Sequence, residues 1–159
     1  MRDEQERAGS TLESKLKVFN DILTKLKPVF SSVFFDLYRD PSTWYRNRSK
    51  YIKSVASSSI AGFILGVGDR HSQNLLFDQT SGEIVHIDLG IAFDQGKLLS
   101  TPEGIPFRLT QNMVDAMGIT KYEGEFKKGC EQTLQVLRDE RDIIFTLLDV
   151  FRHDPLYTW

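Results

Sequence analysis

The sequence predicts an α+β fold that is mainly helical and contains one small β-hairpin. On both sides of residues 66–90, apolar residues recur at helical spacing, as is typical of amphipathic helices that bury one face. Between these stretches the apolar period changes from 3.6 to 2 around a turn-rich segment, which indicates a hairpin. With 159 residues, the chain is expected to form one domain.

Two helices are expected in the first half of the chain. Ser10 and Glu13 have the spacing of a capping box, and an apolar stripe from Leu12 to Leu26 follows them. We expect this stripe to lie in the core or to pack under a second lobe, and a partner-binding face is the open alternative. A second helix is expected to begin after Asp40-Pro41-Ser42 and to end at Gly66 and Gly68.

The hairpin is expected to pair Leu75–Phe77 with Ile84–Ile87 around a turn centred near Thr80 and Ser81. With this turn, the residue numbers of antiparallel partners add up to about 161 or 162. Asn74 would then lie opposite residue 87 or Asp88. An amide oxygen and a carboxylate are therefore expected to converge at the open end of the hairpin.

The rest of the chain is expected to hold a long loop followed by helices. Residues 90–106 contain three glycines and two prolines with little periodicity, which is typical of a functional loop. A short helix is expected from Thr110 to Met117, where Gly118 would stop it. Residues 124–151 predict one broken helix or two consecutive helices.

Composition and charge exclude several classes of protein. The net charge is -2, from 20 basic and 22 acidic side chains, which gives no electrostatic footprint for nucleic acid or an anionic membrane. The longest apolar run, residues 60–67, is too short to span a bilayer, and residues 1–7 lack the apolar region of a secretory signal. Cys130 is the only cysteine, so no internal disulfide forms and a reducing compartment is expected.

Polar residues with the chemistry of phosphoryl transfer gather at one end of the hairpin. Magnesium prefers hard oxygen ligands, and Asn74 and Asp88 would supply two of them. Asp69 and His71 lie on the loop that enters the first strand. Because the transition state is loose, catalysis needs cationic stabilisation and a carboxylate that orients the attacking hydroxyl. Asp69 is expected to orient the hydroxyl, and His71 is expected to stabilise charge.

Residues 68–74, Gly-Asp-Arg-His-Ser-Gln-Asn, and residues 86–90, His-Ile-Asp-Leu-Gly, resemble the catalytic and magnesium motifs of the phosphatidylinositol 3-kinase-related protein kinases. The resemblance continues through residues 102–110, 114–119 and 154–159. It is strongest to the ATM branch in its fungal form. It implies that residues 1–159 form a kinase C-lobe, without the N-lobe and without the C-terminal FATC-type module of that family.

The resemblance also implies a role for each residue of the motifs. Asp69 would be the catalytic aspartate and His71 its charge-stabilising companion. Asn74 and Asp88 would bind the metal of the cofactor. Arg70 would support the catalytic residues and His86 the cofactor-binding residues. The activation loop would run from Leu89 to Phe107. The residues expected to act there are Leu89, Gly90, Asp94, Pro106 and Phe107, together with Arg108 directly after the loop.

By the same resemblance, the cofactors would be ATP and Mg²⁺, with Mn²⁺ as an alternative ion. The substrate would be a serine or threonine followed by glutamine in nuclear proteins of DNA-damage signalling. A lipid headgroup fits less well, because from Ile91 to Phe107 only Lys97 is basic, against Asp94 and Glu103. Neither direct nucleic-acid binding nor membrane binding is expected.

No glycine-rich phosphate loop and no strand lysine precede Leu12, although a kinase clamps ATP with both. We therefore expect an N-lobe and regulatory segments as partners, and little turnover by the isolated chain. Three other interpretations stay open. The chain could be an inactive lobe that serves as an interaction or scaffold module. His71 and His86 could bind zinc with Asp69 or Asp88, and these two carboxylates could be a hydrolase pair.

Overall fold

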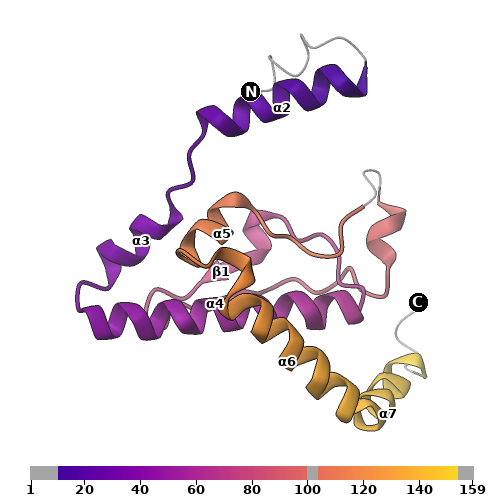
Figure 1. The fold of residues 1–159 in the computed structure, drawn as a ribbon. Coiled ribbons are helices and arrows are strands. Elements are labelled where there is room, and N and C mark those ends of the chain that lie inside the picture. The colour runs from indigo at the N-terminus through magenta and orange to yellow at the C-terminus, as the bar shows by residue number, and fades with distance from the viewer. Residues whose placement is uncertain (1–10, 100–103, 154–159) are drawn as a thin grey trace.

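Helices make up most of the structure, and one two-stranded sheet accompanies them (Figure 1). The computed structural model describes residues 11–99 and 104–153. The mainly helical α+β fold is confirmed. The elements in chain order are α2 (Leu12–Lys25), α3 (Phe30–Leu37), α4 (Pro41–Ile64), the short turn η1 (Ser72–Asn74), β1 (Leu75–Phe77), β2 (Ile84–His86), the turn η2 (Gln95–Leu98), α5 (Gln111–Ala116), the turn η3 (Lys121–Glu123), α6 (Glu125–Asp139) and α7 (Arg141–Arg152).

The long helix α4 is the element against which α3, β2 and α6 pack (Figure 1). Its start is fixed by Asp40, whose Oδ2 accepts a hydrogen bond from the backbone N–H of Thr43 at 2.8 Å, and by Pro41 in the first turn. The helix continues without a break through Ser57–Ser59 and ends just before Gly66, where φ is +60°. Both expected boundaries of this helix are therefore confirmed.

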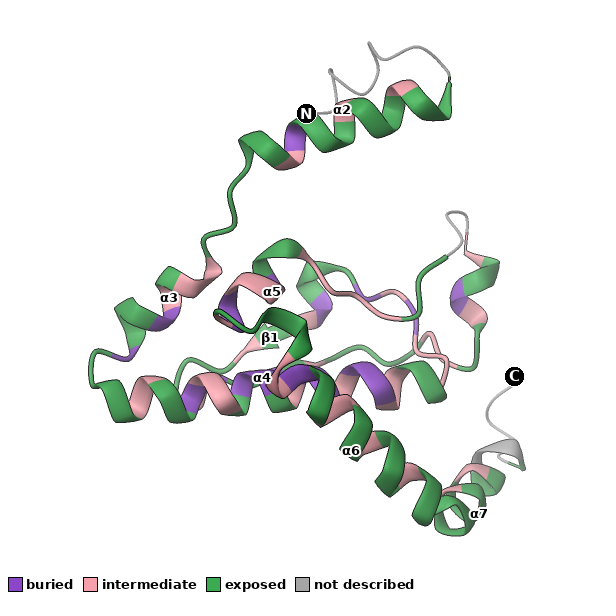
Figure 2. Ribbon diagram, viewed as in Figure 1, coloured by how far each residue is buried: buried purple, intermediate pink, exposed green. Residues whose placement is uncertain are grey.

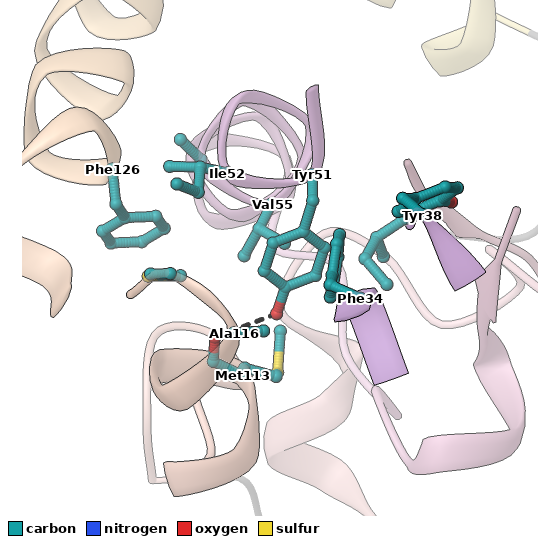
Figure 3. Packing of buried hydrophobic residues seen from close by; sticks show 11 residues of the cluster. Phe34, Tyr38, Tyr51, Ile52, Val55, Met113, Ala116 and Phe126 are labelled. Atoms are coloured by element: carbon teal, nitrogen blue, oxygen red, sulfur yellow. Dashed lines mark hydrogen bonds between the residues drawn. The ribbon is translucent and has the colours of Figure 1, made fainter. Parts of the chain in front are cut away.

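The core contains aromatic side chains from α3 and α4 (Figure 3), and Phe77 of the sheet packs against it. Phe30, Phe34, Tyr51 and Phe77 form edge-to-face pairs with ring centroids 5.2 to 5.7 Å apart. Tyr51 is fully buried, and its hydroxyl donates to the carbonyl of Met113 at 3.0 Å. This bond connects α4 to α5, so the core joins the two halves of the chain.

Helix α3 is absent from the sequence-based expectations. Its start has no capping side chain of its own. Instead, the backbone N–H of Val29 donates to Oδ1 of Asn112 at 2.9 Å, and that of Ser31 donates to Oδ2 of Asp115 at 2.8 Å. Two side chains of α5 thus satisfy N–H groups that every helix start leaves without an intrahelical partner.

The apolar stripe of α2 does not lie in the core of the described chain, so the first of its two expected placements is wrong, and packing under a second lobe stays a prediction. Leu12 is 73% exposed and Phe19 is 48% exposed, and Ile22 is the one buried residue of this helix among those described. The helix stands apart from the rest of the described chain (Figures 1 and 2), so its apolar side chains meet no extensive partner there. Thr11 is its N-cap, without a side-chain cap bond, and Ser10 lies outside the described residues.

The chain after the activation-loop region folds as expected. The short helix α5 precedes Gly118, whose φ is +83°, and the last described part forms two consecutive helices, α6 and α7. Helix α6 crosses α4 closely at Gly129, where a Cβ atom would lie 2.9 Å from Cβ of Ala56. Within residues 11–99 and 104–153, no helix is long and apolar enough to cross a bilayer.

Candidate active site

The hairpin has the register that the sequence predicts. Leu75 pairs with His86 and Phe77 pairs with Ile84, so the residue numbers of partners add up to 161. The ladder continues beyond the strands, because the backbone N–H of Ile87 donates to the carbonyl of Asn74 at 3.0 Å. Asn74 therefore lies opposite Ile87, directly beside Asp88, at the open end of the hairpin.

Arg70 connects the two segments that carry the predicted site. Its side chain is buried. Nε donates to the carbonyl of Gly68 and Nη1 to that of Ile87, both at 2.8 Å, and Nη2 donates to the carbonyl of Asp88. The planar guanidinium can satisfy several acceptors at fixed angles. It thereby holds the backbone just before Asp69 against the backbone at Asp88.

Asn74 is buried, and its amide contacts the loop that carries Asp69. Nδ2 donates to the carbonyl of Asp69 at 2.9 Å, and among the described residues no group donates a hydrogen bond to Oδ1. This orientation leaves a hard amide oxygen for a ligand, and Asp88, the residue after the cross-strand neighbour Ile87, is exposed. Such a pair fits Mg²⁺, which takes one or two protein oxygens and completes its octahedron with phosphate and water.

Asp69 and His71 lie side by side on the loop before η1. Nε2 of His71 is 3.9 Å from Oδ2 of Asp69, and the two side chains are 48% and 43% exposed. Nδ1 of His71 accepts a hydrogen bond from the backbone N–H of Gln73 at 3.2 Å, so the neutral ring carries its proton on Nε2. Asp69 and Asp88 both have left-handed backbones, with φ of 57° and 54°, a conformation that concentrates at functional sites.

His86 lies behind the other residues of the motif. Its half-buried ring shares a small pocket with Ser58 and Gly62 of α4 and with Arg70. Burial, and secondarily the charge of Arg70, lower the pKa of His86 below its usual range. The ring is therefore neutral at pH 7.

The beginning of the predicted activation loop is fixed to the segment that leads into Asp69. Three backbone hydrogen bonds join residues 65–68 to residues 91–94: Gly68 N to Ile91 O at 2.8 Å, Phe93 N to Leu65 O at 2.9 Å and Asp94 N to Gly66 O at 3.1 Å. A Cβ atom on Gly66 would lie 2.5 Å from the nitrogen of Asp94. The close approach of these segments requires glycine there.

The other expected activation-loop residues occupy different environments. Leu89 and Gly90 are exposed, whereas Pro106, Phe107 and Arg108 line the small pocket that contains His86. Phe107 also contacts Phe126 of α6, with ring centroids 6.4 Å apart. Residues 100–103 of the predicted loop lie outside the described residues.

The structure does not bring together the ligands of the alternative zinc site. In the part of the chain that the structure describes, no group of three His, Cys, Asp or Glu side chains could hold a metal ion. The zinc interpretation therefore has no ligand set there. Magnesium bound through one amide and one carboxylate needs no such cluster.

Two residues that contact the hairpin were missed by the sequence reasoning. Oγ of Ser54 accepts a hydrogen bond from the backbone N–H of Ile84 at 2.9 Å, and Nδ2 of Asn47 donates to the carbonyl of Thr80 at 3.0 Å. The sequence did contain a signal for these two residues. They are seven residues apart, so their polar side chains lie on the same face of a helix whose stripe is otherwise apolar.

Comparison with known proteins agrees with this geometry. Residues 3–159 match the family described as phosphatidylinositol 3- and 4-kinase. The chain is 48% identical over 150 residues to the serine/threonine-protein kinase ATM of Arabidopsis thaliana, and 49% identical over 154 residues to the serine/threonine-protein kinase tel1 of Schizosaccharomyces pombe. These alignments cover 94% and 97% of this chain but only 4% and 6% of the two relatives.

A solved structure described as the FAT and kinase domain of CtTel1 has the same fold. It superimposes with a TM-score of 0.94 at 43% identity, over 99% of this chain and 11% of that one. A structure described as a Tel1 kinase butterfly symmetric dimer gives a TM-score of 0.90 at 45% identity, over 99% of this chain and 7% of that one. The chain therefore belongs to the phosphatidylinositol 3- and 4-kinase family, within its branch of ATM and Tel1 serine/threonine-protein kinases.

Proposed function

We propose that this chain forms the catalytic lobe of an ATP-dependent serine/threonine protein kinase. The observation that supports the proposal is the set of side-chain bonds that links the segments carrying Asp69, Asn74 and Asp88. Arg70 binds the backbone carbonyl of Asp88, and the Asn74 amide binds the backbone carbonyl of Asp69. The residues before β1 and the residues after β2 are thus linked at the open end of the hairpin.

Each side chain of this set has a distinct task in the proposed mechanism. Asn74 and Asp88 would hold Mg²⁺, or Mn²⁺ as an alternative ion, and the bound metal with ATP supplies the phosphoryl group and neutralises its charge. Asp69 orients the acceptor hydroxyl and takes its proton. The Nε2–H of His71, beside Asp69, donates toward the charge that develops on the phosphoryl oxygens. Arg70 keeps the two segments at a fixed separation, and neutral His86 supports them from behind.

A protein acceptor agrees with the charge of the proposed activation loop. Within residues 91–99 and 104–107, Lys97 is the single basic residue, and its Nζ is 2.8 Å from Oδ2 of Asp94. A polyphosphorylated lipid headgroup would meet almost no unpaired positive charge there. We infer a serine or threonine acceptor, followed by glutamine, in nuclear proteins of DNA-damage signalling. ATP would be enclosed by an N-lobe from outside these 159 residues.

The test joins this chain to the N-terminal kinase lobe of the Schizosaccharomyces pombe relative and measures phosphate transfer to a Ser-Gln peptide. Asp88→Ala removes a metal ligand and is expected to cost about 3 kcal/mol of transition-state stabilisation, or about 100-fold in rate. The matched control is Asp139→Ala on the exposed surface of α6, where Oδ1 of Asp139 accepts only from Gln135. This control should keep the rate of the unmodified chimera.

Two results would reject the proposal. An Asp88→Ala chimera as fast as the unmodified one would remove this residue from the chemistry. A folded, ATP-binding chimera that transfers no phosphate would favour the alternative of a non-catalytic interaction module.

A further inference from the structure

We propose that Ser54 of α4, together with Asn47, is a positioning residue for the metal-binding pair Asn74 and Asp88. Neither Ser54 nor Asn47 would touch the metal or the nucleotide. Both would act through the backbone of the hairpin from whose open end the two ligands emerge. The inference rests on the proposed kinase function, because it concerns the geometry of the proposed site.

The first step concerns the outer edge of β2. In an antiparallel pair, hydrogen-bonded and non-hydrogen-bonded residue pairs alternate. The N–H of Asp78 bonds to the carbonyl of Glu83, and the N–H of Ile87 bonds to the carbonyl of Asn74. The pair of Phe77 with Ile84 is therefore of the non-hydrogen-bonded type, and the N–H of Ile84 points away from β1.

Ser54 satisfies this outward N–H. Its Oγ accepts from Ile84 at 2.9 Å and donates its own proton to the carbonyl of Tyr51 at 2.9 Å. Ile84 is buried, so an unmet N–H at this point would carry a desolvation cost. Ser54 thereby fixes the position of β2 on α4.

Asn47 fixes the turn in the same way. The side chain is 3% exposed, and Nδ2 donates to the carbonyl of Thr80. Gly82, with φ of +82°, lies so close that a Cβ atom would be 2.7 Å from the Asn47 carbonyl oxygen. The hydroxyl of Tyr38 adds a bond to the carbonyl of Gln79 at 2.8 Å.

These contacts align α4 with β2, and the two elements run in the same direction. From the N-terminal end of α4 onward, Asn47 meets the turn, Ser54 meets the start of β2, and Ser58 shares a small pocket with His86 at the end of β2. Asp69 follows the end of α4, and Asp88 follows the end of β2. The position of β2 along α4 therefore sets where Asp88 lies relative to Asp69, to whose carbonyl the amide of Asn74 is bonded. A sheet of two three-residue strands is too small to hold that position by itself.

The test measures Mn²⁺ affinity by electron paramagnetic resonance in the chimera, with a non-hydrolysable ATP analogue present. Ser54→Ala is expected to weaken Mn²⁺ binding by about tenfold, at the low end of the range for residues that orient metal ligands, and to raise the KM for Mg²⁺ similarly. The KM for the peptide should not change. Ser54→Thr keeps the hydroxyl and should retain the unmodified affinity.

The matched control is Ser57→Ala, on the same helix. Ser57 is exposed, and its hydroxyl donates only to the carbonyl of Ser54 at 3.2 Å, so its removal should leave Mn²⁺ affinity unchanged. If Ser54→Ala does not fold, Ser54→Cys is used instead, because it keeps the side-chain volume with a weaker acceptor. An intermediate loss of affinity is then expected.

The outcomes separate this inference from the proposed function. Unchanged Mn²⁺ affinity in the folded Ser54 variants, with a loss in Asp88→Ala, would overturn the positioning role and leave the kinase proposal intact. Lower stability without any change in Mn²⁺ affinity would show a purely structural role and would also overturn it. Unchanged affinity in Asp88→Ala would instead reject the metal site, and the positioning role with it.

Discussion

Gly66→Ala is expected to destabilise the chain by about 3 kcal/mol and to separate the proposed activation loop, at residues 91–94, from residues 65–68. A non-glycine residue at φ of +60° costs about 1 kcal/mol. The new Cβ would lie 2.5 Å from the backbone nitrogen of Asp94, so the two segments must move apart. Two hydrogen bonds, Asp94 N to Gly66 O and Phe93 N to Leu65 O, would then be lost at about 1 kcal/mol each.

The assay is urea unfolding followed by circular dichroism, with two glycine controls. A Cβ on Gly104 would meet nothing within 4 Å, so Gly104→Ala should be neutral. Gly62 lies inside α4, where a Cβ would be 3.8 Å from Cβ of Val67, and Gly62→Ala should stabilise the helix by about 0.5 kcal/mol. If Gly66→Ala unfolds within about 0.5 kcal/mol of Gly104→Ala, the argument from steric overlap is wrong.

Two further predictions concern single side chains. Tyr51→Phe removes the buried bond to the carbonyl of Met113 and should lower the free energy of unfolding by about 1 kcal/mol in the same urea assay; an equal or higher value would show that this bond adds no stability. For His86, burial lowers the folded-state pKa below the unfolded value of about 6.5, so the unfolded state binds the proton more readily. Stability should therefore be fully present above about pH 6.5 and fall as the pH decreases toward the folded pKa. His86→Gln should lose less stability than the unmodified chain between pH 7.5 and pH 5, and equal losses would contradict the assignment.

The sequence predicts the elements whose signals are local. The hairpin register follows from a short turn between two β-prone runs, and α4 begins at an aspartate and proline that cap and start it. Helix α3 carries no such signal, because its capping groups are Asn112 and Asp115, more than 80 residues away in the sequence. Capping side chains that come from another element leave no local pattern.

The distinction between local signals and contacts of distant segments also applies to the candidate site. Asp69, His71, Asn74 and Asp88 lie in two short motifs, residues 68–74 and 86–90, and the hairpin register brings Asn74 opposite Ile87, the residue before Asp88. The buried position of Arg70 and the use of its donors on three carbonyls depend on how two loops meet in space. For the apolar stripe of α2, the sequence predicts burial in a core that the structure does not show. Amphipathic spacing predicts a buried face without saying which partner buries it.

The hydrogen bonds that α5 accepts from the start of α3 also bear on how the chain folds. Helix α3 is completed only after a contact across more than 80 residues has closed, and such contacts cost chain entropy before they add stability. During synthesis on a ribosome, the start of α3 therefore lacks these two acceptors until α5 has emerged. Folding of this lobe is in that respect a late and collective event.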